Sequence, residues 1–198
     1  MSACGGDSSS DADEPTGTYP VEVSDASFAA TQRLGQTYLM KLGIRNSGRK
    51  AIPALTVTVS LTGKEGDTST LPFAIHDPQP DLAQPDRPVW VLAEHYPKFA
   101  GSSKPGGADT SNQKTYDFGR LKAGATTEVV WKLSAVRTGR YTLAYTVGAG
   151  IGGGAKAETA EGVEPGGTFT ARISSAPLDK EVTDSGEVVD KKSSAAAQ

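Results

Sequence analysis

The side chains best suited to hold a metal ion gather in one stretch of the chain. Imidazole and carboxylate groups bind divalent metals in proteins. Both histidines and four nearby acids make up this set: His76, Asp77, Asp81, Asp86, Glu94 and His95. Their spacing follows no known metal-site pattern, and the prolines at 78, 80, 85 and 88 indicate a stiff, extended loop that carries solvated polar groups. We therefore expect no metal ligands here and keep a metal site at His76 and His95 as an alternative.

Aromatic side chains near the same loops offer a second kind of site, a platform for a sugar. Trp90, Tyr96, Tyr116 and Phe118 lie near long loops, where binding residues often gather. The same four side chains are equally suited to anchor those loops in the core. Both interpretations stay open, and residues 76–118 are where a carbohydrate or metal ion would bind if the chain is a receptor.

Nucleophilic catalysis requires a nucleophile beside a base, and the sequence offers no such set. The GxSxG pattern of a nucleophile elbow is absent. Ser111 to Lys114 fits SxxK, but it falls in a polar segment rich in glycine and proline, which we expect to be a mobile loop. The companion SDN and KTG motifs are missing. We therefore expect no catalytic residue and no enzyme activity.

The run from Gly148 to Gly153 fits GxGxxG, a pattern in which glycines bring a helix N-terminus close to a pyrophosphate. The residues that follow, up to Gly162, leave room for at most two helical turns, and Pro165 comes shortly after. A hairpin turn on Gly152–Gly154 explains these glycines better. We expect neither a nucleotide nor any other cofactor.

Cys4 is the only cysteine, so no intrachain disulfide can form. The small residues Ser2 and Ala3 precede it, and residues 5–18 hold almost no large apolar side chain, a composition typical of a flexible tether. This arrangement resembles the lipobox of bacterial lipoproteins, whose cysteine becomes the first residue and carries a diacylglycerol thioether. Met1 stands where that family has leucine, and we interpret it as an initiator that replaced a signal peptide. The alternative is a free cysteine on a frayed terminus.

The charge composition argues against two classes of partner. The chain has 20 Lys and Arg against 23 Asp and Glu, a net charge of −3, and its basic residues are scattered. Nucleic-acid binding requires a basic stripe, and an anionic membrane surface likewise attracts basic clusters. No apolar run approaches the roughly 18 residues of a membrane-spanning helix. We expect contact with a membrane only through a lipid on Cys4.

Alternation of apolar and polar residues with a period of two dominates the chain and predicts about eight short strands, as in a sandwich or barrel. The apolar residues expected to share a face are Val21 and Val23; Tyr38, Met40, Leu42 and Ile44; Leu55, Val57, Val59 and Leu61; Leu71, Phe73 and Ile75; Val89 and Val91; Val129, Trp131 and Leu133; Tyr141, Leu143, Tyr145 and Val147; and Phe169, Ala171 and Ile173. Residues 26–34 could instead form one or two helical turns, or equally well cross between two sheets.

Two stretches resemble bacterial surface immunoglobulin-like domains, notably the cell-adhesion-related (CARDB-type) group. Residues 42–59 are similar to its pattern of a strand, an Asn-x-Gly turn at Asn46 and a second strand. Within residues 121–143, Tyr141 is similar to the tyrosine corner, whose hydroxyl bonds to upstream backbone. Leu143 stands where antibody domains have a cysteine, so their inter-sheet disulfide is absent. The resemblance spans residues 36–150 and implies a spacer, adhesin or interaction module, and we expect Trp131 to be plain core.

We therefore expect an all-β, immunoglobulin-like antiparallel β-sandwich, forming a single domain over residues 18–176. A lipobox remnant and flexible tether at 1–17 precede it, and a short extension and disordered tail at 177–198 follow, with room for a hairpin at 177–189. The expected function is a non-catalytic module at the outer face of the cell membrane that spaces, adheres, or binds a protein or the cell wall. The alternatives are a carbohydrate or metal receptor and an envelope hydrolase with paired carboxylates, because fold alone does not fix function.

Overall fold

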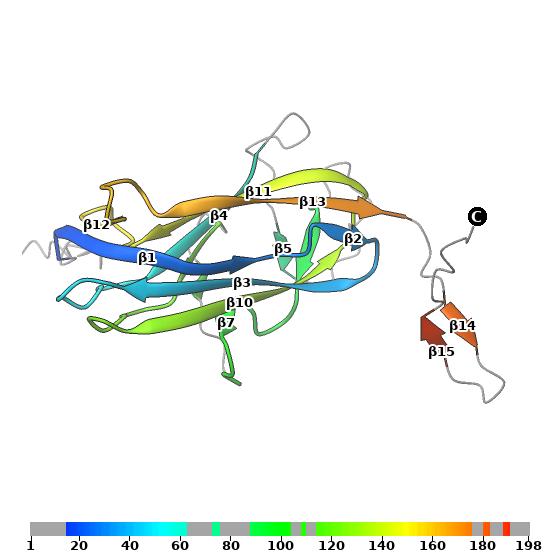
Figure 1. Ribbon diagram of the computed structural model, residues 1–198, viewed down its shortest axis with the longest axis horizontal. Helices are drawn as coiled ribbons and strands as arrows, with labels where there is room; N and C mark the ends of the chain where they lie inside the picture. Colours follow the sequence, from blue (N-terminus) through cyan, green and yellow to red (C-terminus); the bar gives the residue numbers. More distant parts are fainter. Residues whose placement is uncertain are drawn as a thin grey trace, which may run out of the picture.

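Strands dominate the architecture. The computed structural model describes residues 15–62, 73–75, 88–103, 108–109, 114–175, 180–182 and 188–190. Within these residues the chain forms two sheets that face each other, with no helix, and hence no helix that could span a membrane (Figure 1). The expected all-β, immunoglobulin-like sandwich is confirmed.

The first sheet has seven strands and is built around β3. In spatial order they are β12 (Ala155–Glu158), β1 (Gly17–Ser27), β3 (Thr37–Asn46), β10 (Thr126–Ala135), β6 (Trp90–Leu92) and β5 (Phe73–Ile75), with β7 (Lys98–Phe99) also paired to β10. The pairings of β3 with β1 and with β10 are antiparallel and extend along most of its length. A register shift, or bulge, interrupts β1 between Val23 and Asp25.

The second sheet has six strands and is centred on β11 and β4. In spatial order they are β2 (Thr31–Arg33), β13 (Gly166–Ser174), β11 (Gly139–Gly148), β4 (Thr56–Thr62), β9 (Thr115–Asp117) and β8 (Ala108–Asp109). β14 (Lys180–Val182) and β15 (Val188–Asp190) pair antiparallel as a separate ribbon. This ribbon corresponds to the hairpin expected within residues 177–189.

Three pairs at the sheet margins are parallel rather than antiparallel, namely β1 with β12, β13 with β2, and β5 with β6. Two of them arise because the chain crosses from one sheet to the other. β11 ends in the second sheet at Gly148, and β12 begins in the first sheet at Ala155 beside β1. The expected hairpin on Gly152–Gly154 is therefore wrong: the glycines form a crossing, and β12 pairs with β1 instead of β11.

The segment 26–34 is the other crossing, and the helix considered for it is wrong. β1 ends in the first sheet at Ser27, and β2 resumes in the second sheet at Thr31. The competing interpretation, a crossing between sheets, is confirmed. Within β2, the side chain of Gln32 is fully buried and receives a hydrogen bond from the indole Nε1 of Trp90 at 2.7 Å, which ties this crossing to the core.

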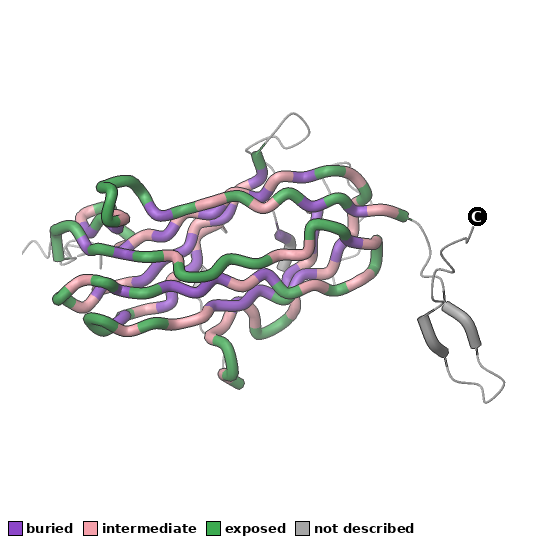
Figure 2. The backbone as a smooth tube through the Cα atoms, in the orientation of Figure 1, coloured by how far each residue is buried: buried purple, intermediate pink, exposed green. Residues whose placement is uncertain are grey.

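The core lies between the sheets and follows the predicted alternation in most strands (Figure 2). In β11 the side chains of Tyr141, Leu143, Tyr145 and Val147 are buried, and those between them are partly exposed. β6 differs from the prediction, because Trp90 and Leu92 face the core and Val91 is only half-buried. The large indole takes the inward position, since it removes more apolar surface from water than a valine would.

A buried amide fixes the connection between β3 and β4. Asn46 has no exposed surface, and its Nδ2 donates to the carbonyl oxygens of Lys50, Leu121 and Lys122 at 2.9, 3.2 and 3.1 Å. Its Oδ1 accepts from the backbone N–H of Gly48 at 3.0 Å. The expected Asn-x-Gly turn is thus present, and it ties this connection to the segment that leads into β10.

The tyrosine corner implied by the resemblance is also present. Tyr141 Oη donates to the carbonyl oxygen of Thr138 at 2.7 Å, at the start of β11. Gly139 lies between them with φ of 144°, where an added Cβ would approach Tyr141 Oη to 2.8 Å. A glycine is therefore needed at this position for the ring to reach the backbone.

Candidate functional site

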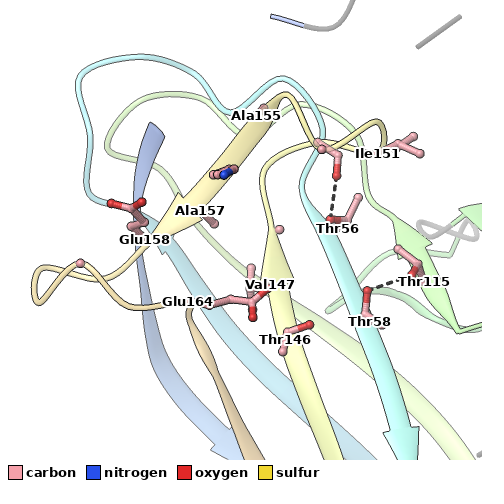
Figure 3. A pocket seen from close by; sticks show the side chains of 15 residues that line it. Thr56, Thr58, Thr115, Thr146, Val147, Ile151, Ala155, Ala157, Glu158 and Glu164 are labelled. Atoms are coloured by element: carbon pink, nitrogen blue, oxygen red, sulfur yellow. Dashed lines mark hydrogen bonds between the residues drawn. The ribbon is translucent and has the colours of Figure 1, made fainter. Parts of the chain in front are cut away.

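A polar groove of about 440 Å³ opens where β11 leaves the second sheet (Figure 3). Its walls come from β4, β9 and β11 on one side and from β12 and the connections around it on the other. The side chains that give it its chemistry are Thr56, Thr58, Thr115, Thr146, Glu158 and Glu164. Hydroxyl and carboxylate groups make it a site for hydrogen bonds with a polar ligand.

Strand register places three of the hydroxyls in a row. Thr146 of β11 lies opposite Thr58 of β4, which in turn lies opposite Thr115 of β9. The Oγ1 atoms of Thr58 and Thr115 are 2.8 Å apart and share a hydrogen bond, and Thr56 Oγ1 donates to the carbonyl oxygen of Gly150 at 3.4 Å (Figure 3). The contact between Thr58 and Thr115 fixes these two hydroxyls relative to each other within the row.

The glycine-rich run supplies backbone to the groove instead of a phosphate cradle. Gly148, Gly150 and Gly153 line it, and β12 follows where the dinucleotide fingerprint needs a helix. An added Cβ at Gly148 would lie 2.3 Å from Thr56 Oγ1, so this glycine lets Thr56 occupy the wall. The run therefore serves close packing between β11 and β4.

Charge in and near the groove comes from β12 and the turn after it. Glu158 and Glu164 contribute carboxylates, and Lys156 contributes one ammonium group. In the turn between β12 and β13, a hydrogen bond from the Thr159 side chain and then one from the backbone N–H of Glu161 lower the pKa of the exposed Glu161 carboxyl. The described lining of the groove thus holds two carboxylates against one ammonium group, a balance that favours neutral or cationic ligands.

On the inner face of β11, next to the groove, burial raises the pKa of the Tyr145 phenol. Its ring stacks on Phe169 with centroids 5.3 Å apart. Gly167 lies against the hydroxyl, since an added Cβ would approach Tyr145 Oη to 2.7 Å. Tyr145 thus belongs to the core and supplies no acid or base to the groove.

The metal set considered from the sequence falls largely outside the described residues. His76, Asp77, Asp81 and Asp86 lie there, and Glu94 and His95 are the members that can be placed. The His95 Nε2 and Glu94 Oε1 atoms are 3.5 Å apart, on side chains that are 66% and 82% exposed. Among the residues that can be placed, no group of three or more His, Cys, Asp or Glu side chains is suited to a metal ion.

The aromatic platform considered from the sequence is wrong for three of its four members. Trp90 is fully buried, and Tyr116 and Phe118 are at most 5% exposed. Tyr116 and Phe118 both pack edge-on against Trp131, with ring centroids 5.9 and 5.7 Å away. The alternative, that these rings anchor their loops in the core, is confirmed, as is the core position of Trp131.

Tyr96 is the member that stays near the surface. It is half-buried, and the Nζ of Lys98 lies 4.7 Å from its ring centroid. The Lys98 ammonium group therefore already occupies one face of the Tyr96 ring. Two other sequence-derived positions cannot be placed, because Cys4 and Ser111 lie outside the described residues.

Sequence reasoning missed the threonine row. Thr56 and Thr58 were recognised only as the polar half of an alternating strand, which is the ordinary composition of a solvent-facing strand. Only the register between β11, β4 and β9 brings Thr146, Thr58 and Thr115 together. No local signal in the sequence carries that register.

No protein-family model matches the chain, and no curated protein matches it. Similar solved structures include a CARDB domain from Pyrococcus furiosus in complex with di-metal ions (11% identity, TM-score 0.40, 78% of this chain and 93% of that chain). A cohesin module from a Clostridium perfringens family 33 glycoside hydrolase is also similar (9% identity, TM-score 0.41, 78% of this chain and 96% of that chain). AvmM, which catalyses macrocyclization in alchivemycin A biosynthesis, is similar too (12% identity, TM-score 0.41, 77% of this chain and 89% of that chain). The fold assignment rests on the two facing sheets of this chain.

Proposed function

We propose that this chain is a non-catalytic module of the bacterial cell envelope, held at the outer face of the membrane by a lipid on Cys4, where it spaces or binds another envelope component. The observation that supports the proposal best is the position of the residues that had seemed able to build a site. Trp90, Tyr116 and Phe118 are committed to the core, and His95 is exposed with the adjacent Glu94 as its neighbour. Three of the four aromatic side chains that a binding platform would need thus have structural roles.

The position at which β1 begins fits a module that is attached to the membrane through an N-terminal tether. The sandwich begins at Gly17, at the end of the molecule where β12 and the groove lie (Figure 1). Residues 5–16 reach at most roughly 40 Å when fully extended. With a lipid on Cys4, the groove end would face the membrane and the turn at residues 136–138 would face outward.

The lipid anchor is tested in cells that express the natural precursor. Globomycin-sensitive processing and labelling with a radioactive fatty acid are measured for the wild type, for Cys4→Ser and for the control Ser8→Ala. We expect both signals in the wild type and the control and neither in Cys4→Ser, because thioether formation needs the thiol. Fatty-acid labelling that persists in Cys4→Ser would contradict the anchor.

The interaction role is tested by crosslinking on intact envelopes followed by capture of the tagged chain. A reproducible partner, recovered with the lipidated chain and competed by excess soluble sandwich, is the expected result. Recovery of none, together with hydrolysis of an envelope polymer by the purified chain, would replace the module with an enzyme.

The groove supports a second candidate, a receptor for a neutral carbohydrate. The row of Thr146, Thr58 and Thr115 offers hydroxyl groups at sheet spacing, suited to the hydroxyls of a sugar. A glycan array is the test, with Thr58→Val as the variant and Thr62→Val, on the same strand outside the groove, as the control. Binding lost in Thr58→Val alone would favour the receptor, and an array without signal would remove it.

A further inference from the structure

We propose that Arg140 and Arg172 form a binding site for a doubly charged phosphate group, at the end of β11 remote from the groove. Arg140 lies in β11 and Arg172 in β13, and the antiparallel register places them directly opposite each other. Both side chains are exposed, on the outer face of the second sheet. The site is independent of the lipid anchor and of the threonine groove.

The register brings the two side chains as close as neighbouring strands allow. The backbone N–H of Arg172 donates to Ala30 at 2.8 Å, on the side of β13 away from β11. The pair between Arg172 and Arg140 is therefore of the non-hydrogen-bonded kind, in which the Cα atoms are only about 4.5 Å apart. Like charges at such a position destabilise a sheet.

Nothing among the described residues neutralises this pair. The ion pairs among the described residues join Lys41 to Glu128, Arg45 to Glu22, and His95 to Glu94. Arg45 is a matched comparison, since it also lies on an exposed strand face, and the residue directly opposite it is Glu22, with 3.8 Å between the charged groups. The residue directly opposite Arg140 is an arginine, whereas the residue directly opposite Arg45 is an acid.

The surroundings are suited to an anion. A surface hollow of about 750 Å³ lies at the pair, and Thr138, Ser174 and Ser175 line it beside the two arginines, with no acid among the lining residues that the structure describes. Arg33 lies opposite Ser174 in the register of β2 and β13, and Arg137 directly precedes Thr138. The hydroxyl groups add hydrogen-bond donors, and Arg137 adds a positive charge next to this lining in the sequence.

The chemistry of the pair selects the ligand. A guanidinium group donates two parallel hydrogen bonds to the oxygens of a phosphate or carboxylate. Two adjacent guanidinium groups match a group of charge about −2, which a phosphate monoester approaches at neutral pH. A single carboxylate would leave one positive charge uncompensated, so the pair favours the dianion.

The test is a titration of the full chain with inorganic phosphate at pH 7.5 and constant ionic strength. Binding is followed by the NMR shifts of the backbone amides of residues 138–140 and 172–175, and by the urea midpoint of unfolding. We expect saturable shifts and a raised midpoint for the wild type. The double variant Arg140→Gln, Arg172→Gln should bind phosphate at least about tenfold more weakly, equivalent to about 1.4 kcal/mol, and the control Arg45→Gln should bind as the wild type does.

Two further measurements keep the proposal falsifiable. In low salt without phosphate, Arg172→Gln should raise the urea midpoint, because it removes the repulsion. Replacement of both arginines by lysine keeps the charge and the fold but should still weaken phosphate binding, because the planar fork is lost. Equal responses of the wild type and the double glutamine variant to phosphate, or an equal response of the wild type to acetate at the same ionic strength, would overturn the assignment.

Discussion

Two fully buried tryptophans have opposite polar surroundings. The indole N–H of Trp90 donates to Gln32 Oε1 at 2.7 Å, and Gln32 Nε2 donates to the carbonyl oxygen of Ala29 at 2.9 Å. The indole nitrogen of Trp131 has no hydrogen-bond partner within the described part of the chain. A buried polar group costs free energy unless it is hydrogen-bonded, so the two indoles should respond differently to loss of the N–H.

The pairing of Trp90 with Gln32 can be measured by a double-mutant cycle. Gln32→Met should lower the free energy of unfolding by about 2–3 kcal/mol, because it leaves the indole N–H and a carbonyl oxygen unsatisfied. The double variant Gln32→Met, Trp90→Phe should lose about 1–2 kcal/mol less unfolding free energy than the sum of the two single losses. Urea denaturation gives these values, with Trp131→Phe as the reference for an unpaired indole. Additive losses would mean that the hydrogen bond contributes nothing.

Whether an aromatic residue is core or surface was only partly readable from the sequence. Tyr116 and Phe118 are two positions apart, a spacing that puts both on one face of a strand, and both proved to be buried. The spacing alone cannot say whether that face meets the core or a ligand. Gln32 carried no signal at all, because its partner Trp90 is remote in sequence and reaches it only through the crossing between the sheets.

At the scale of elements, the contact between Gly148 of β11 and Thr56 of β4 decides how closely the two strands approach. Gly148→Ala should cost about 1–3 kcal/mol, because its Cβ would lie 2.3 Å from Thr56 Oγ1. In a Thr56→Ala background most of this cost should disappear, since the Thr56 Cβ is 3.7 Å from the same point. Thermal or urea unfolding of the four proteins measures the coupling.

The background variant Thr56→Ala is its own control, because it removes the hydroxyl without adding volume. Should Gly148→Ala cost the same in both backgrounds, the close approach of these strands would not depend on Thr56. A cost near zero in the wild-type background would show that the two strands separate easily at this end.

The positions of the strands could be predicted, because alternation is a local property. The register of β11 on β4 is not a local property and could not be predicted. The seven residues of β4 alternate between buried and partly exposed over most of their length, as expected. β12 was missed because its four residues follow a run of glycines, which carries no side-chain pattern to indicate a strand or its partner. The helix considered near Phe28 is wrong because this segment passes from β1 to β2, where Gln32 is buried against Trp90, a contact that local spacing does not reveal.

At the scale of the whole molecule, the core formed by the residues whose burial is described extends as far as β13. The buried apolar residues extend from Tyr19 to Ile173, and β14 forms a sheet with β15 alone among the described residues. A chain that ends at Ser175 should therefore have the same free energy of unfolding as the full chain, within about 0.5 kcal/mol. Circular dichroism and fluorescence during urea unfolding measure both.

A chain that ends at Ala171 is the control for that prediction. It loses Ile173, which is 3% exposed, and the residues through which β13 pairs with β2. Loss of a buried isoleucine alone costs about 2–5 kcal/mol, so this chain should be far less stable. Equal stability of the two shortened chains would mean that the core does not extend to Ile173.

The sandwich itself could be predicted from the sequence, and the groove and the arginine pair could not. Alternation in several segments requires two faces to be buried, and two facing sheets satisfy that. The proximity of Arg140 and Arg172, however, depends on which residues of β11 and β13 lie opposite each other. A slip of one position would separate them, and the intervening connection gives no hint of the register.

The chain enters the sandwich at Gly17 and leaves it at Ser174, at opposite ends of the molecule (Figure 1). A pull applied between these points would run along β1 and β13, nearly perpendicular to the antiparallel hydrogen bonds that join β1 to β3 and β13 to β11. Those bonds would be loaded in shear, all at once, rather than opened one by one from an end. The topology thus gives the domain the build of a tension-bearing link.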